Sequence, residues 1–93
     1  MLGVKLKELR ESNGFVQRQI AAELEIDTAY VSKMENGEKQ LSRHHLKKLS
    51  TFYRIDENEL LTLWMADKII KIIENEKVGV DAIELVLNSN IKV

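Results

Sequence analysis

The chain has 93 residues, 44% of them hydrophobic and 31% charged, a composition typical of a folded soluble domain and unlike that of a disordered chain. It has no cysteine, which excludes disulfides and thiolate metal sites, and its apolar runs are shorter than the roughly 18–20 residues that span a bilayer. The N-terminus also lacks an uninterrupted apolar signal segment, so we expect a cytoplasmic protein with no membrane contact.

The net charge of −1 is unevenly distributed along the chain. Residues 1–54 contain ten Lys and Arg against seven Asp and Glu, whereas residues 55–93 contain four against eight. A basic first part and an acidic second part are compatible with a DNA-facing region followed by one that faces away from DNA. The same charge imbalance is common on proteins that do not bind DNA. It is therefore compatible with DNA binding but is only weak evidence for it.

Helical spacing of apolar residues dominates the sequence, and glycines separate the helical segments. Proline is absent, and Gly14, Gly37 and Gly79 stand where left-handed backbone would end a helix. No strand-like alternation or internal repeat is visible. The pattern predicts helices at residues 2–13, 16–24, 28–36, 43–53, 57–76 and 82–89, with a break near Ala66-Asp67 as an alternative within the fifth.

Four of the predicted helices start with the same local pattern. An apolar residue precedes an Asp or Ser cap, and a second apolar residue follows four positions after the cap, which is the hydrophobic staple. In two of the four, Glu59 and Glu84 stand at the third helical position and complete a capping box. The four sets are Ile26-Asp27-Val31, Leu41-Ser42-Leu46, Ile55-Asp56-Leu60 and Val80-Asp81-Leu85.

The second and third predicted helices are short, and only residues 25–27 separate them. Such a short turn prevents an antiparallel pair and holds the two helices at a steep angle, with the small Ala21 allowing close approach. The third helix would then point short polar side chains and one long cation outward, which suits a helix lying in the DNA major groove. The predicted shared core is Ile20, Ala21, Leu24, Ile26, Val31 and Met34.

This segment resembles the helix-turn-helix of the XRE family, which includes lambda-type phage repressors, restriction–modification controller proteins and many antitoxins. The resemblance covers residues 2–61, including Leu9-Arg10, Leu46, Leu49 and Ile55. It rests on two strings that together form a strong signal, Gln17-Arg18-Gln19-Ile20-Ala21 and Val31-Ser32-Lys33-Met34-Glu35-Asn36-Gly37. The resemblance implies an all-α fold, namely a five-helix lambda-repressor-like helix-turn-helix domain with one or more additional C-terminal helices for dimerisation.

The resemblance also implies roles for particular residues. The base-reading positions would be Thr28, Ala29, Ser32 and Lys33. The phosphate-contacting positions would be Gln17, Tyr30, Asn36, Lys39 and Arg43, with Arg18 evenly balanced between DNA contact and solvent. Arg10 and Glu35 match a structural ion pair of the family.

Two positions depart from the family pattern. Glu25 occupies the turn position that usually holds Gly, and a left-handed conformation there would cost on the order of 1 kcal/mol. Val16 replaces the usual Ser or Thr cap, so the second helix is expected to begin irregularly. Both departures affect the contacts expected of Gln17.

No catalytic arrangement of residues is visible, and we expect neither an enzyme nor a cofactor. His44 and His45 are neighbours in sequence and lack carboxylate or cysteine partners at ligand spacing, so no metal site is predicted.

The C-terminal part carries more apolar residues than one helix edge can bury within a single chain. We expect residues 1–61 to bind DNA and residues 62–93 to pack on the same domain and form a homodimer interface, with a core formed within one chain as the alternative. Two recognition helices about 34 Å apart would read a palindrome. The leading interface candidates are Trp64, Ile69, Ile72 and Ile73.

Three functions therefore remain open. The first is a sequence-specific, homodimeric transcription regulator that represses or activates and contacts double-stranded DNA and, for activation, polymerase. The second is an antitoxin whose C-terminal helices bind a toxin while its first part binds its own operator. The third is a protein-interaction module that has kept the fold without binding DNA.

Overall fold

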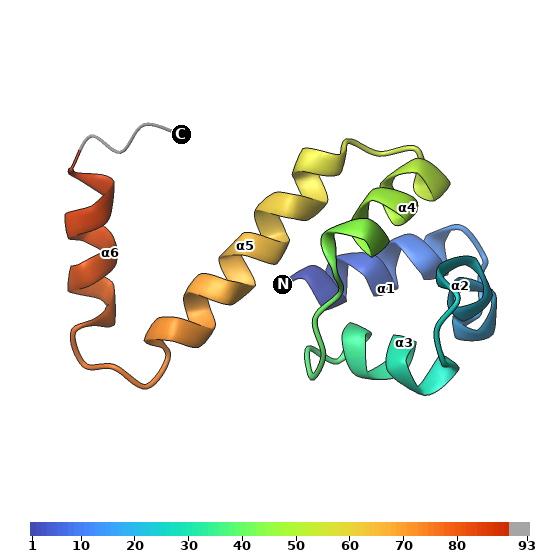
Figure 1. The fold of residues 1–93 in the computed structure, drawn as a ribbon, viewed down its shortest axis with the longest axis horizontal. Helices are drawn as coiled ribbons and strands as arrows, with labels where there is room; N and C mark the ends of the chain where they lie inside the picture. Colours follow the sequence, from blue (N-terminus) through green and yellow to red (C-terminus); the bar gives the residue numbers. More distant parts are fainter. Residues whose placement is uncertain (90–93) are drawn as a thin grey trace.

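The computed structural model describes residues 1–89, so the last four residues of the predicted C-terminal extension lie outside the described range. Within it the chain is all-helical, as predicted (Figure 1). None of the described helices is long and apolar enough to cross a membrane. The six helices are α1 (Leu2–Ser12), α2 (Gln17–Leu24), α3 (Thr28–Glu35), α4 (Arg43–Tyr53), α5 (Glu57–Ile73) and α6 (Gly79–Leu87).

Helices α1 to α4 and the first half of α5 enclose one apolar core (Figure 1). The staple residues Val31, Leu46 and Leu60 are fully buried, because each closes the first turn of its helix against this core. The remaining buried apolar side chains come from every helix of the group and, for Leu41, from the loop between α3 and α4: Leu2, Leu6, Ile20, Ala21, Leu24, Met34, Leu41, Leu49 and Trp64.

Trp64 belongs to this core and not to a free surface, which corrects the expectation that it lies at an interface between copies. Only 7% of the residue is exposed, and its indole N–H donates to the carbonyl of Leu41 at 2.7 Å. Trp64 points inward from α5 because a large ring with a satisfied N–H is the group best suited to fill the space beneath the α3–α4 loop.

The α2–α3 turn is tight because Glu25 adopts left-handed backbone, with φ 57° and ψ 46°. The Ile26 N–H then donates to the Ala21 carbonyl at 3.0 Å, and α3 crosses α2 steeply (Figure 1). Arg54, which ends α4, adopts the same left-handed backbone conformation. The sequence pattern did not predict this second strained position. Each of these residues stores on the order of 1 kcal/mol.

Helix α2 begins cleanly at Gln17, contrary to the expectation of an irregular start. The Val16 side chain has no acceptor, but the side-chain carbonyl of Gln19 accepts a hydrogen bond from the Val16 backbone N–H at 2.8 Å. Gln19 therefore makes one half of a capping box and substitutes for the missing hydroxyl cap.

Capping of the later helices differs from the prediction in three places. The Asp27 side chain makes no capping hydrogen bond on α3. Asp56 caps α5 through the N–H of Asn58, but Glu59 pairs with Lys5 at 3.1 Å instead of closing a capping box. Asp81 lies inside the first turn of α6 and is not its cap, because α6 begins earlier, at Gly79.

The two C-terminal helices also differ from their predicted bounds. Helix α5 is continuous through Ala66 and Asp67 and ends at Ile73 rather than at residue 76. Gly79 starts α6 instead of separating helices, since α6 approaches the end of α5 closely there. A Cβ at Gly79 would lie 2.8 Å from the Cβ of Ile73, so only glycine fits.

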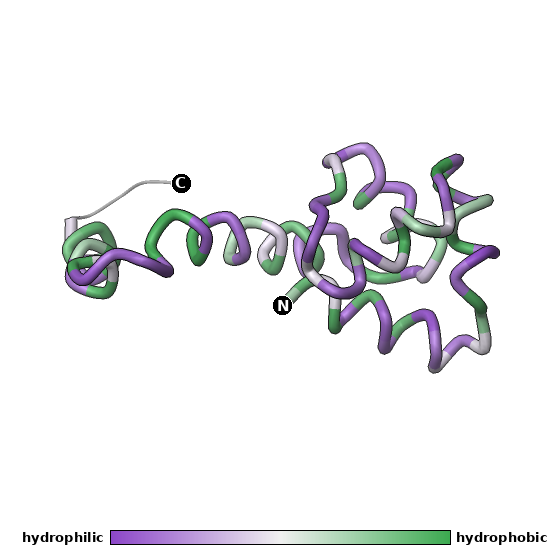
Figure 2. The backbone as a smooth tube through the Cα atoms, turned by 90° about the horizontal axis from the view of Figure 1, so that it is seen from below, coloured by the Kyte–Doolittle hydropathy of each residue, from purple (hydrophilic) through white to green (hydrophobic). Residues whose placement is uncertain are grey.

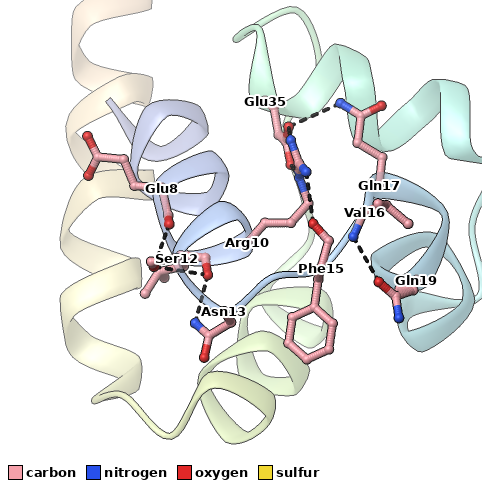
Figure 3. A network of polar contacts seen from close by, with 10 residues as sticks. Glu8, Arg10, Ser12, Asn13, Phe15, Val16, Gln17, Gln19 and Glu35 are labelled. Atoms are coloured by element: carbon pink, nitrogen blue, oxygen red, sulfur yellow. Dashed lines mark hydrogen bonds and ion pairs between the residues drawn. The ribbon is translucent and has the colours of Figure 1, made fainter.

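A buried ion pair ties α1 to α3 (Figure 3). Arg10 binds Glu35 through Nε at 2.7 Å and Nη2 at 3.0 Å, and its Nη1 donates to the Phe15 carbonyl at 3.0 Å. The exposed fractions of the two side chains are 11% and 3%. The hydrogen bond to Glu35 is the main cause that holds the pKa of Arg10 above its ordinary value.

Phe15 and two aromatic residues of α4 form a cluster of rings. The ring centroids of Phe15 and Phe52 are 5.0 Å apart, and those of Phe52 and Tyr53 are 5.1 Å apart. Burial, assisted by the charge of Glu35, raises the pKa of Tyr53 to about 12. The low exposure of the Arg10 and Glu35 side chains, 11% and 3%, limits the access of water and therefore strengthens the attraction between them.

Asp67 holds the start of α1 against α5. Its carboxylate accepts from the Leu2 backbone N–H at 3.0 Å and pairs with the N-terminal amine of Met1 at 3.2 Å. A carboxylate at a helix N-terminus also interacts favourably with the helix dipole. Asp67 therefore fixes the direction in which α5 leaves the core.

Replacing Gly3 with alanine is expected to destabilise the protein by about 1–3 kcal/mol. A Cβ there would lie 2.5 Å from the Glu35 carbonyl oxygen and 2.6 Å from that of Met34, so α1 would have to move away from α3. Urea unfolding measures the change, with Val4→Ala on the exposed face of α1 as the control. Equal stability of Gly3→Ala and Val4→Ala would contradict the close packing of α1 on α3.

Replacing Glu35 with glutamine is expected to cost about 3 kcal/mol of unfolding free energy, because it leaves the charge of Arg10 enclosed without a partner. The matched control is Glu59→Gln, which breaks the exposed pair with Lys5 and should cost less than about 1 kcal/mol. Chemical denaturation of both variants checks the difference. Similar losses in the two variants would refute a structural role for the buried pair.

Candidate DNA interface

Helix α3 presents one continuous outward face. Thr28, Ala29 and Lys33 are exposed and Ser32 is half-buried, and their spacing of one, four and five positions places them on the same side of the helix. The opposite side is locked into the core by Val31, Met34 and Glu35, which are at most 6% exposed. The four predicted base-reading residues therefore share a rigidly held surface.

Three exposed cationic side chains belong to the elements that precede and follow α3 in the chain. Arg18 lies in the first turn of α2, Lys39 in the loop after α3, and Arg43 at the start of α4, and all three are exposed. Asn36 ends α3 and is exposed as well. Cations at these positions can contact a nucleic-acid backbone on both sides of a helix that lies in a groove.

Gln17 takes part in the structural network beneath this surface. Its side-chain amide donates to Glu35 Oε1 at 3.1 Å, so it joins α2 to the ion pair between α1 and α3 (Figure 3). A side-chain amide has two N–H donors, and one is used in this contact. The second N–H remains the donor through which Gln17 could reach a phosphate.

Tyr30 is bound to the loop between α3 and α4, and its phosphate contact stays a prediction. Its hydroxyl donates to the backbone carbonyl of Gln40 at 2.6 Å and so braces the loop between α3 and α4. In the structure the Tyr30 hydroxyl therefore supports the loop that carries Lys39.

Arg43 is positioned by the core tryptophan. The centre of its guanidinium lies 5.4 Å from the centroid of the Trp64 ring, and the ammonium of Lys68 lies 3.6 Å from the same centroid. Each such cation–π contact is worth about 0.5–1 kcal/mol at an exposed site. Sequence reasoning missed this support because residues 43, 64 and 68 meet only in the folded chain.

His45 adds little charge to this region. Burial, followed by the nearby His44 and Lys48, lowers the pKa of His45, so His45 is neutral at pH 7. Within residues 1–89, no three His, Asp or Glu side chains lie close enough together to hold a metal ion. The positive charge around α3 therefore comes from Arg18, Lys33, Lys39 and Arg43.

The other expected interface residues lie on the second half of α5. Ile69 and Ile72 are exposed, at 43% and 74%, and Ile73 is half-buried beside α6. This surface projects away from the helices that surround α3 (Figure 1). The structure thus separates the candidate DNA-contacting residues from the candidate partner-contacting residues.

Comparison with known proteins identifies the family of the chain. The family model described as helix-turn-helix matches residues 6–60, which is more than half of the chain. Control protein C.MunI from Mycoplasma sp is 38% identical over 61 residues, covering 64% of this chain and 82% of that protein. No significant match was found among solved structures. The chain therefore belongs to the XRE-type helix-turn-helix family of DNA-binding transcriptional regulators.

Proposed function

We propose that the protein is a sequence-specific transcription regulator that binds a palindromic operator as a homodimer. The observation that carries the proposal is the outward face of α3, formed by Thr28, Ala29, Ser32 and Lys33 above a fully packed inner face. Because the backbone of α3 is held by the core, the free energy of binding is not spent on ordering the helix.

The four side chains match the chemistry of the major groove. Lys33 reaches far enough to donate to guanine O6 or N7, and the methyl of Ala29 is suited to the thymine methyl. Thr28 and Ser32 offer hydroxyls that either donate or accept. Gln17, Arg18, Asn36, Lys39 and Arg43 would contact phosphates and set the register of the helix without reading sequence.

A dimer follows from the small size of this reading surface. One short helix contacts only a few base pairs, each good contact being worth about 1–3 kcal/mol of discrimination. Two copies related by a two-fold axis would read two half-sites separated by whole DNA turns of about 34 Å. In this proposal residues 1–61 bind DNA and residues 62–93 join the copies through Ile69, Ile72 and Ile73.

The relative's name adds a specific biological setting. Control protein C.MunI is 38% identical to this chain, and its name describes a controller. We infer that this protein likewise controls the transcription of neighbouring genes. It would repress where the operator overlaps the polymerase site and activate where the bound dimer touches polymerase.

Base reading is tested with Ser32→Ala and Lys33→Ala. Fluorescence anisotropy compares the DNA upstream of the gene with a scrambled duplex, at two salt concentrations. The wild type should prefer the upstream DNA roughly a thousandfold, and each substitution should reduce that preference about fivefold to a hundredfold. Lys7→Ala, on the exposed face of α1, is the control and should leave it unchanged. Equal, weak and salt-sensitive binding to both duplexes would contradict the proposal.

Phosphate contact is tested with Lys39→Ala and Arg43→Ala. Each should weaken binding to both duplexes about equally and reduce the slope of log affinity against log salt by about 1. Tyr30→Phe is the informative comparison, because its hydroxyl is bonded to Gln40. It should leave the salt slope unchanged, because a neutral hydroxyl releases no counterion. Unchanged affinity for both duplexes would show that the hydroxyl only supports the loop, and an equal loss of affinity for both would show that it contacts phosphate.

A further inference from the structure

The C-terminal arm, defined as residues 65–89, projects from the rest of the molecule (Figures 1 and 2). The radius of gyration is 15.1 Å, whereas a compact chain of this length would have about 12 Å. The longest dimension, 42 Å, runs along this projection. The arm is therefore ordered in helices but is not part of the enclosed core.

Helix α6 is poorly supported by its own chain. It has nine residues, and the only buried one is Gly79, which contacts Ile73. Leu85 and Leu87 are 73% and 75% exposed. Isolated helices shorter than about 12–15 residues are marginal in water, so a helix of this length needs tertiary packing to persist.

The arm presents both an apolar groove and apolar ridges. The groove has a volume of about 300 Å³ and lies between α5 and α6, and every side chain that lines it is apolar: Ile69, Ile72, Ile73, Ala82, Ile83, Val86 and Leu87. Leu85 and Ile72 project from the same two helices. A surface with both shapes can pack against its own copy across a two-fold axis.

The exposed apolar area of the arm is as large as a stable dimer requires. Nine exposed large apolar side chains of the arm together offer on the order of 900 Å², against about 800 Å² per partner in a standard interface. They are Met65, Ile69, Ile70, Ile72, Val78, Val80, Leu85, Val86 and Leu87.

Charge also favours a second copy as the occupant. Residues 65–89 contain three Lys against five Asp and Glu, so the arm repels a phosphate backbone. Lys68 and Lys71 lie on α5, whereas Asp81 and Glu84 lie on α6. If α6 of one copy packs on α5 of the other, Asp81 and Glu84 of α6 approach Lys68 and Lys71 of the other copy's α5.

We propose that α6 is stable as a helix only when a second copy of the chain covers the arm, so that dimerisation and folding of α6 are one event. The inference rests on the homodimer of the proposed function and adds its regulation. At low concentration the chain is a monomer with a folded core and an unfolded α6. The concentration at which α6 folds then sets the concentration at which a palindrome is bound.

The test uses the full chain at concentrations spanning its dimerisation. Sedimentation measures the mass, and hydrogen exchange measures the protection of the amides of residues 82–88, which are hydrogen-bonded in α6. On dilution, α6 should lose at least about tenfold in protection as the mass falls to that of the monomer, while α2 to α4 stay protected. Leu85→Asp should be monomeric with α6 unprotected at every concentration. Val4→Asp, which changes a similarly exposed apolar residue on α1, should behave as the wild type.

Two results would overturn the inference. One is a monomer whose α6 remains protected, which would mean that its own chain suffices. The other is a wild type that is monomeric at all concentrations. That result would mean that the arm binds a different protein, such as a toxin, and not a second copy. Failure of the proposed function is distinguishable, because monomeric Leu85→Asp should still bind a single half-site in a manner that depends on Lys33. Loss of all Lys33-dependent binding would refute the DNA proposal without affecting the mass and exchange results.

Discussion

The carboxylate of Glu35 is the point on which the arrangement of the first three helices depends. It is almost completely buried and accepts hydrogen bonds from Arg10 Nε and Nη2 and from the amide of Gln17, so α1, α2 and α3 meet at one charged group (Figure 3). A buried charge is tolerated only when it is fully partnered, and the geometry that satisfies all three donors is narrow. Since Glu35 and Thr28 belong to the same eight-residue helix, fixing Glu35 also fixes the direction in which α3 faces outward.

The consequences of that constraint extend from the core to the surface. Gly3 allows α1 to lie against the last carbonyls of α3, and Tyr30 ties the following loop to the same helix. Trp64 fills the space under that loop and supports Arg43 on its outer side. Helices α1 to α4 and the first half of α5 therefore form a closely packed unit. The arm differs, because α6 contributes only Gly79 to the buried residues.

Local sequence patterns predicted the elements whose signals are local. The staples at Val31, Leu46 and Leu60 placed three helices correctly, because cap and staple lie within one turn of each other. Some failures were local, since Gln19 caps α2 from three residues away and Asp27 makes no capping hydrogen bond. Others depended on contacts between distant residues. Glycine is a residue type that commonly ends a helix. Gly79 instead begins α6, because it lies too close to Ile73 for any side chain to fit. The apolar residues of α5 cover most of its circumference, so the sequence alone could not decide that Trp64 points inward while Ile72 points outward. The hydrogen bond from Tyr30 to Gln40 was not predicted, because its acceptor lies ten residues away in a loop without a regular pattern.

The central claim is that α3, held by the core, is the element that enters DNA. The most direct test is a titration of isotope-labelled protein with a duplex of the upstream DNA, followed by amide chemical-shift changes in NMR spectra. The account predicts that the largest changes fall on residues 28–33, with smaller ones at Gln17, Arg18 and residues 36–43. Changes confined to residues 62–89, with the amides of α3 unaffected, would contradict it.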